Sequence, residues 1–145
     1  MPAKTVRFED MEEGSEGPAF KIENITRTNI VRYAGASGDF NPIHHDEPYA
    51  QSLGYPGIFA MGMMTAGFLS RLPSAWFGLK HLRRYQVRFV SQAWPGDTLT
   101  FKGKVAKKYE EEGSGIVEID LVVENQKSEA VITGKATAAF PLKSD

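Results

Sequence analysis

The most telling absence from this chain of 145 residues is cysteine. Without cysteine there is no disulfide, no thiolate zinc site and no cysteine nucleophile, and such a composition suits a reducing compartment. Charge of one sign is not in excess either, because 17 Lys and Arg stand against 18 Asp and Glu. A general nucleic-acid binder normally carries a strong basic surplus, so we expect no nucleic-acid partner.

Long hydrophobic runs are missing too. The longest apolar stretch extends from Ile58 to Leu69, well short of the roughly 18 residues that a membrane-spanning helix requires. Residues 1–10 contain no apolar segment of signal-peptide length. We therefore expect a cytoplasmic protein that does not associate with a membrane.

What is present suits a single globular domain spanning residues 1–145. Hydrophobic residues make up 41% of the chain and charged residues 24%, which is enough apolar material for a core that needs no disulfide or metal.

The carboxyl half predicts an antiparallel sheet. Apolar and polar residues alternate there, as they do in half-buried strands, and short glycine-containing turns separate the runs. Sequential strands joined by short turns pair antiparallel. The predicted strands of this half are Tyr85–Phe89, Leu99–Val105, Val117–Val123 and Val131–Phe140, and one further strand, Phe20–Ile25, is predicted near the amino terminus.

One predicted helix runs from Gly62 to Leu72 and is closed by Pro73. It is apolar almost all round, so it must be enclosed on nearly every side. The small residues Gly62, Ala66 and Ser70 share one face, because they are four residues apart. Something can therefore approach that face closely.

A shorter helix is predicted through Ile30 and Tyr33, with Thr28 as its amino-terminal cap and with Gly35 and Gly38 ending it. The segment after it is predicted to be extended as far as residue 57.

One buried helix and a sheet of long antiparallel strands define an α+β fold. The simplest packing wraps a curved sheet around the central helix, which is the hot-dog arrangement. A single sheet of this kind leaves one edge and much apolar surface open, so we expect a dimer.

The segment from Gly38 to His44 is the candidate site. It places the carboxylate of Asp39 five residues before the imidazole of His44, and Pro42 stiffens the chain between them. The pair offers a charged acceptor and a group that takes or gives a proton near neutrality. Asp, Asn, Gly and Pro also dominate ordinary turns, so the spacing alone leaves a plain surface turn open as an alternative.

The wider sequence resembles a known family, the MaoC-like (R)-specific enoyl-thioester hydratases and dehydratases. The resemblance rests on Asp-x-Asn-Pro-x-His at Asp39 to His44 and on the later Gly62-Met63. Residues 87–90 and 95–99 also resemble the family, so the likeness covers nearly the whole chain. Its finer features are most similar to bacterial (3R)-hydroxyacyl dehydratase subunits. Met61 stands where the family usually has histidine.

The resemblance implies reversible hydration of trans-2-enoyl thioesters to (3R)-3-hydroxyacyl thioesters, without a cofactor or metal. Asp39 and His44 would be the catalytic pair, and the Gly62 amide at a helix amino terminus would form the oxyanion hole. The substrate would be carried on coenzyme A or on an acyl carrier protein. The implied substrate-binding residues are Asn41, Met63 and Ser70.

Two of these residues have alternative interpretations. The Ser70 hydroxyl could instead bond back to the Ala66 carbonyl of its own helix. Asn41 is expected to shape the loop rather than to react.

Other polar residues are less informative. Adjacent His44 and His45 point in different directions in an extended chain, so we expect no metal site. His81 is predicted to lie on the surface at the start of a strand. A basic cluster could receive coenzyme A phosphates or an acidic carrier protein, or could be a solvated strand face. Its members are Lys80, Arg83, Arg84 and Arg88.

Two rival functions remain at this point. A hot-dog acyl thioesterase would usually carry its acidic residue on or beside the central helix, and residues 62–72 contain no Asp or Glu. A non-catalytic subunit of a heterodimeric dehydratase would lack the Asp39 and His44 pair. A homodimer is expected, and a catalytic subunit paired with a related chain is the alternative.

Overall fold

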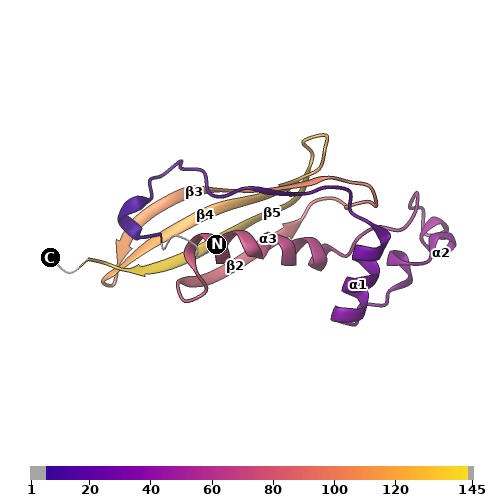
Figure 1. Ribbon diagram of the computed structural model, residues 1–145, viewed down its shortest axis with the longest axis horizontal. Coiled ribbons are helices and arrows are strands. Elements are labelled where there is room, and N and C mark those ends of the chain that lie inside the picture. Colours follow the sequence, from indigo (N-terminus) through magenta and orange to yellow (C-terminus); the bar gives the residue numbers. More distant parts are fainter. Residues whose placement is uncertain (1–5, 144–145) are drawn as a thin grey trace.

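A computed structural model describes residues 6–143 of the chain. In that range one antiparallel sheet of five strands forms the long body of the molecule, and a helix packs along one face of it (Figure 1). Two shorter helices lie together at one end (Figure 1). The helices are α1 (Arg27–Ser37), α2 (Glu47–Ser52) and α3 (Gly62–Phe77), with short 3-10 turns η1 (Phe8–Asp10) and η2 (Pro42–His44). The strands are β1 (Phe20–Ile22), β2 (Leu82–Phe89), β3 (Leu99–Glu111), β4 (Ser114–Glu124) and β5 (Ala130–Pro141).

The strand order across the sheet is β1-β3-β4-β5-β2. The hairpins β3-β4 and β4-β5 follow the chain, whereas β2 crosses to the far side and pairs with β5. Gly113, with φ of 77°, makes the tight turn between β3 and β4. This topology leaves β1 and β2 as the two edges of the sheet.

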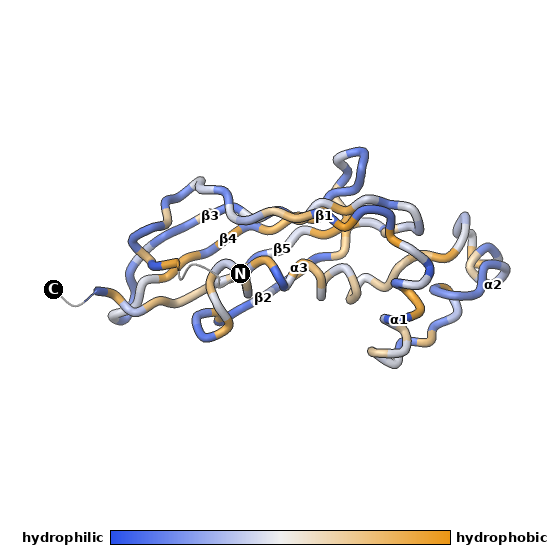
Figure 2. Tube along the Cα trace, in the orientation of Figure 1, coloured by the Kyte–Doolittle hydropathy of each residue, from blue (hydrophilic) through white to orange (hydrophobic). Residues whose placement is uncertain are grey.

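The core lies between α3 and the sheet. Buried side chains of α3, such as Leu69 and Leu72, face buried strand residues such as Phe101 and Ile132. Apolar and polar stretches alternate along the strands, whereas α2 is mostly hydrophilic (Figure 2). This arrangement is the α+β hot-dog domain that the sequence predicts, with the central helix against the antiparallel sheet.

The predicted carboxyl end of the central helix is wrong, because α3 continues through Pro73 to Phe77. Proline removes one backbone donor and normally kinks a helix. Here Pro73 is buried in the core and Phe77 packs edge-on against Phe140 of β5, with ring centroids 5.7 Å apart. The Ser74 hydroxyl also donates to the Ser70 carbonyl at 2.7 Å. Tertiary packing therefore holds the last turn in place.

The helix α1 is capped two residues earlier than predicted. Thr26, not Thr28, is the cap residue, because its hydroxyl accepts from the Asn29 N–H at 3.0 Å while the Asn29 side chain accepts from the Thr26 N–H at 2.8 Å. The helix does not stop at Gly35 but ends at Gly38, which has φ of 74°. The segment predicted as extended up to residue 57 instead contains η2 and α2.

His81 is buried rather than on the surface, which corrects the prediction made for it. The residue is 8% exposed, and its ring stacks on Phe140 with centroids 4.5 Å apart. Its Nδ1 lies 3.1 Å from the Ala139 carbonyl. An aromatic neighbour on β5 accounts for the burial, and such a cross-strand neighbour is not visible in local sequence.

Tyr85 ties the edge strand to the central helix. Its hydroxyl donates to the Ala66 carbonyl of α3 at 2.6 Å. Burial raises the pKa of Tyr85 to about 12, because the charged phenolate is disfavoured away from water. Within residues 6–143, none of the helices is long and apolar enough to span a bilayer.

We predict that Tyr85→Phe lowers the free energy of unfolding by about 1 kcal/mol, the usual net value of one such hydrogen bond. The folded pKa lies above the unfolded value of 10.0. The stability that Tyr85 contributes is therefore complete below pH 10.0 and is lost as the pH rises through about 12. Urea unfolding of both proteins across that range should show the difference shrinking. A difference that does not change with pH would contradict this account.

Candidate active site

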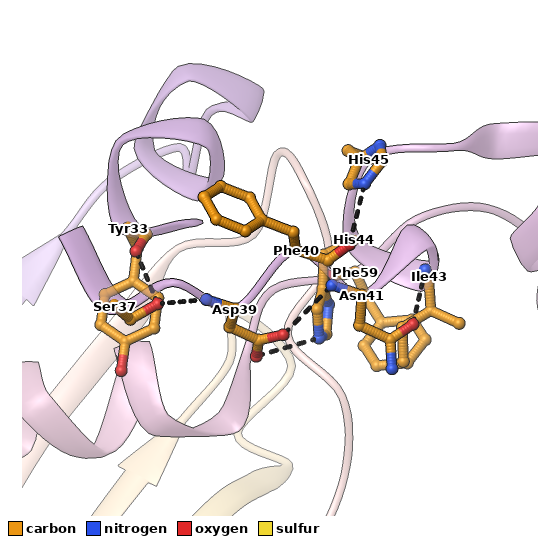
Figure 3. A network of polar contacts seen from close by, with 9 residues as sticks. All are labelled: Tyr33, Ser37, Asp39, Phe40, Asn41, Ile43, His44, His45 and Phe59. Carbon is orange, nitrogen blue, oxygen red and sulfur yellow. Dashed lines mark hydrogen bonds and ion pairs between the residues drawn. The ribbon is translucent and has the colours of Figure 1, made fainter. Parts of the chain in front are cut away.

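The carboxylate of Asp39 is delivered by the end of α1. Gly38 adopts the left-handed conformation that ends the helix, and Asp39 is the next residue. The Asp39 N–H donates to the Ser37 hydroxyl at 3.2 Å, and that hydroxyl donates to the Tyr33 carbonyl at 2.8 Å (Figure 3). The backbone that carries the carboxylate is therefore attached to the last turn of α1.

The short turn η2 sets the position of His44. The Asn41 side-chain oxygen accepts from the Ile43 N–H at 3.1 Å, and Pro42 is the first residue of the turn. The Asn41 N–H in turn donates to the Asp39 carboxylate at 3.3 Å. These contacts agree with the expectation that Asn41 shapes the loop. The Ile43 N–H already occupies the side-chain oxygen of Asn41.

The His44 ring is nearly fully buried, with 7% of its surface exposed. Its Nδ1 lies 2.6 Å from the Phe59 carbonyl oxygen, and the Phe59 ring packs edge-on against it with centroids 5.3 Å apart. A carbonyl oxygen only accepts, so Nδ1 carries the hydrogen. In the neutral ring Nε2 is then the basic atom with a free lone pair.

The basic nitrogen of His44 faces the carboxylate of Asp39 (Figure 3). Nε2 lies 3.8 Å from Asp39 Oδ2, and the Asp39 side chain is 42% exposed. That separation is too long for a direct hydrogen bond. Two acceptors therefore point toward the same small space, one of them open to solvent.

Gly62 is the first residue of α3. The first N–H groups of a helix have no acceptor within the helix, and the helix dipole makes that end positive. A cavity of about 340 Å³ is lined by both Asp39 and Gly62. Its other walls come from residues 59–63, Thr65, residues 89–93, Val131 and Ile132. His44 does not line this cavity itself. It adjoins two residues that do, because its Nε2 lies 3.8 Å from Asp39 Oδ2 and its Nδ1 bonds the Phe59 carbonyl.

Three site residues implied by the resemblance fall in different places. Met63 lines the cavity and is 59% exposed. Asn41 and Ser70 are not part of its wall. The Ser70 hydroxyl donates to the Gly67 carbonyl at 2.7 Å, so it bonds back to its own helix but not to the predicted acceptor at Ala66.

An ion pair that the sequence did not suggest braces the segment. Arg27 at the start of α1 bonds the Glu47 carboxylate of α2 at 2.7 Å. The other Glu47 oxygen lies against the backbone of Gly57, where a Cβ would collide with it. Arg27 and Glu47 are 20 residues apart and neither belongs to a motif, so only the fold brings them together.

The remaining polar candidates are positioned as follows. His45 Nε2 lies 3.2 Å from the Phe40 carbonyl and turns away from His44 (Figure 3). In residues 6–143 there is no group of three or more His, Asp or Glu placed to hold a metal ion. The basic cluster does not line the cavity, and its role stays a prediction.

Comparison with known proteins places the chain in a family. Residues 13–127 match the family described as MaoC like domain. The chain is 31% identical over 141 residues to an (R)-specific enoyl-CoA hydratase from Rhodospirillum rubrum, covering 94% of this chain and 92% of the relative. The chain therefore belongs to the MaoC-like domain family.

Solved structures show the same fold. The R-hydratase PhaJ1 from Pseudomonas aeruginosa superposes with a TM-score of 0.80 at 23% identity, over 96% of this chain and 88% of that one. The ChsH1-ChsH2 complex from Mycobacterium tuberculosis gives a TM-score of 0.75 at 25% identity, over 89% of this chain and 98% of that one.

We predict that Asn41→Ala lowers the free energy of unfolding by about 1 kcal/mol, because the Ile43 N–H loses its side-chain acceptor. Asn41→Asp keeps an acceptor oxygen at that position and is the matched control. Thermal unfolding of both variants measures the difference. Equal losses in the two variants would show that the cap does not hold the turn.

Proposed function

We propose that this protein reversibly adds water to trans-2-enoyl thioesters to form (3R)-3-hydroxyacyl thioesters. The observation that carries the proposal is the pair of acceptors, His44 Nε2 and Asp39 Oδ2, 3.8 Å apart and facing one space. A water bound there can donate one hydrogen to each of them. Such a water is held with its oxygen lone pairs directed away from both groups, toward a substrate.

The proton inventory follows from that arrangement. One water proton passes to the His44 and Asp39 pair as the oxygen attacks the β-carbon. The pair returns a proton to the α-carbon, so the elements of water add across the double bond without any change in oxidation state. Dehydration runs through the same groups in reverse. The exposed carboxylate of Asp39 is the member of the pair that contacts the cavity.

Charge develops on the thioester oxygen while the β-carbon is attacked. The Gly62 N–H, at the positive end of α3 and on the same cavity as Asp39, is the proposed donor to that oxygen. Met63 would contact the acyl chain. Asn41 acts by shaping the loop. We assign Ser70 no contact with the substrate, because Ser70 does not line the cavity of a single chain.

The relative from Rhodospirillum rubrum supports the substrate class, since its name specifies (R)-specific enoyl-CoA hydration. The carrier is either coenzyme A or an acyl carrier protein, and the site of action is the cytoplasm. The chemistry needs no redox cofactor. The thioesterase alternative loses support, because α3 carries no Asp or Glu along its whole length.

We further propose that two copies associate through β2. This strand forms one edge of the sheet, and an edge presents N–H and C=O groups that another strand can pair with. An exposed apolar side chain, Leu79, stands close to the beginning of this strand. A homodimer is the proposal, and a dimer with a related subunit is the alternative.

Sedimentation velocity of the purified chain should give twice the mass of one chain. A monomer that dimerises only when a related subunit is added would support the alternative. A monomer under both conditions would rule out both assemblies.

The activity itself has a direct test. The purified protein should bleach the ultraviolet absorbance of a conjugated enoyl thioester. Asp39→Asn and His44→Gln should each lower kcat/KM by about 100-fold to 10,000-fold, the range for loss of a general acid or base. His45→Gln is the matched control, because His45 turns away from the pair, and it should retain most of the activity. Wild-type rates in Asp39→Asn and His44→Gln would refute the mechanism.

A further inference from the structure

Phe89 stands at the end of the edge strand β2, and its backbone is held firmly. It pairs with Ile132 of β5. Immediately after it, the N–H groups of Val90 and Ser91 both donate to the Val131 carbonyl, at 2.9 Å and 3.2 Å. The Ser91 hydroxyl adds a bond to the Ala130 carbonyl at 2.9 Å. The backbone at Phe89 is therefore fixed on both sides.

The ring of Phe89 lies over Gly62. A Cβ added to Gly62 would be 2.8 Å from Phe89 Cε1, 2.9 Å from Cδ1 and 3.3 Å from Cζ. The first two distances are shorter than carbon atoms tolerate, so a side chain at position 62 would require the Phe89 ring to move. With glycine at this position, the ring edge lies directly against residue 62.

Phe89 is also only partly covered. Its side chain is 53% exposed, and the neighbouring cavity residues Met63 and Val90 are 59% and 51% exposed. All three line the same cavity as Asp39. A half-exposed phenyl ring is held by dispersion contacts alone, so the ring can change rotamer while its backbone stays in place.

We propose that Phe89 is the residue that determines the size of the acyl group this site accepts. The inference rests on the proposed function. A thioester oxygen bound to the Gly62 N–H places the first acyl carbons beside Gly62, and the Phe89 ring edge is already in contact with that residue. We expect a short chain to be accommodated in the cavity that the ring and Asp39 both line, without movement of the ring. A longer chain has to displace the ring, and its affinity is reduced by that displacement.

The test compares four-carbon and eight-carbon thioesters of pantetheine, the group shared by coenzyme A and acyl carrier proteins. Turnover of the trans-2-enoyl forms and calorimetric binding of the saturated forms are measured in parallel. In Phe89→Ala the ratio of eight-carbon to four-carbon kcat/KM should rise about tenfold or more, through KM, since even one methylene in an apolar pocket changes selectivity by about that factor. The ratio of binding constants should rise with it.

Phe89→Leu keeps an apolar side chain at the edge of the sheet and should give an intermediate ratio. Leu53→Ala is the matched control, because Leu53 is as exposed as Phe89, at 53%, and lies outside both the cavity and β2. An unchanged ratio in a folded Phe89→Ala, with wild-type hydration intact, would overturn the role of Phe89 and leave the proposed function standing. Failure of the wild type to hydrate or bind either thioester would overturn both. Binding without hydration, with the ratio raised in Phe89→Ala, would keep the acyl site and overturn the reaction.

Discussion

The hydrogen bond between His44 Nδ1 and the Phe59 carbonyl, at 2.6 Å, is the interaction on which the rest of the site depends. It joins the segment that follows α1 to the stretch that leads into α3. Because a carbonyl only accepts, the bond also fixes which ring nitrogen is basic and where it points. Burial of the ring keeps water from competing for that carbonyl. Without this bond, neither the orientation of the His44 ring nor the nitrogen that faces Asp39 would be fixed.

The sheet serves the site by holding α3 in one position. The helix is buried against β3 and β5, and the Tyr85 hydroxyl clamps its Ala66 carbonyl from the edge strand. The amino terminus of α3 therefore meets the segment carrying His44 at a constant place, and Gly62 comes to line the same cavity as Asp39. The same edge strand brings Phe89 over Gly62, so one element both supports the helix and limits the space beside it.

Much of this arrangement was predictable from sequence because it depends on local periodicity. Alternation located the strands, and the apolar character of residues 62–72 identified a helix that had to be enclosed. The side of β2 that faces α3 follows from the same alternation, so Phe89 could have been placed on the same face of the strand as Tyr85 and Val87. The contact between Gly62 and Phe89 could not have been predicted from the sequence, because it depends on how α3 is positioned on the sheet.

The errors share one cause, which is packing between residues far apart in the chain. Pro73 usually ends a helix, but here the last turn is held by Phe77 against β5. His81 was predicted to lie on the surface, but in the folded chain its ring stacks on Phe140 and is buried. The ion pair between Arg27 and Glu47 belongs to the same class, because it joins two helices that no local pattern relates.

The sequence by itself determined the class of fold, the residues proposed here as acid and base, and the residue at the start of the central helix. These depend on side-chain chemistry and on spacings of a few residues, which a linear chain displays directly. The tertiary structure decided which nitrogen of His44 is basic, what faces Asp39 and which ring covers Gly62. Each of those depends on a partner far away in the chain, the Phe59 carbonyl or the end of β2, and only folding brings such partners within contact distance.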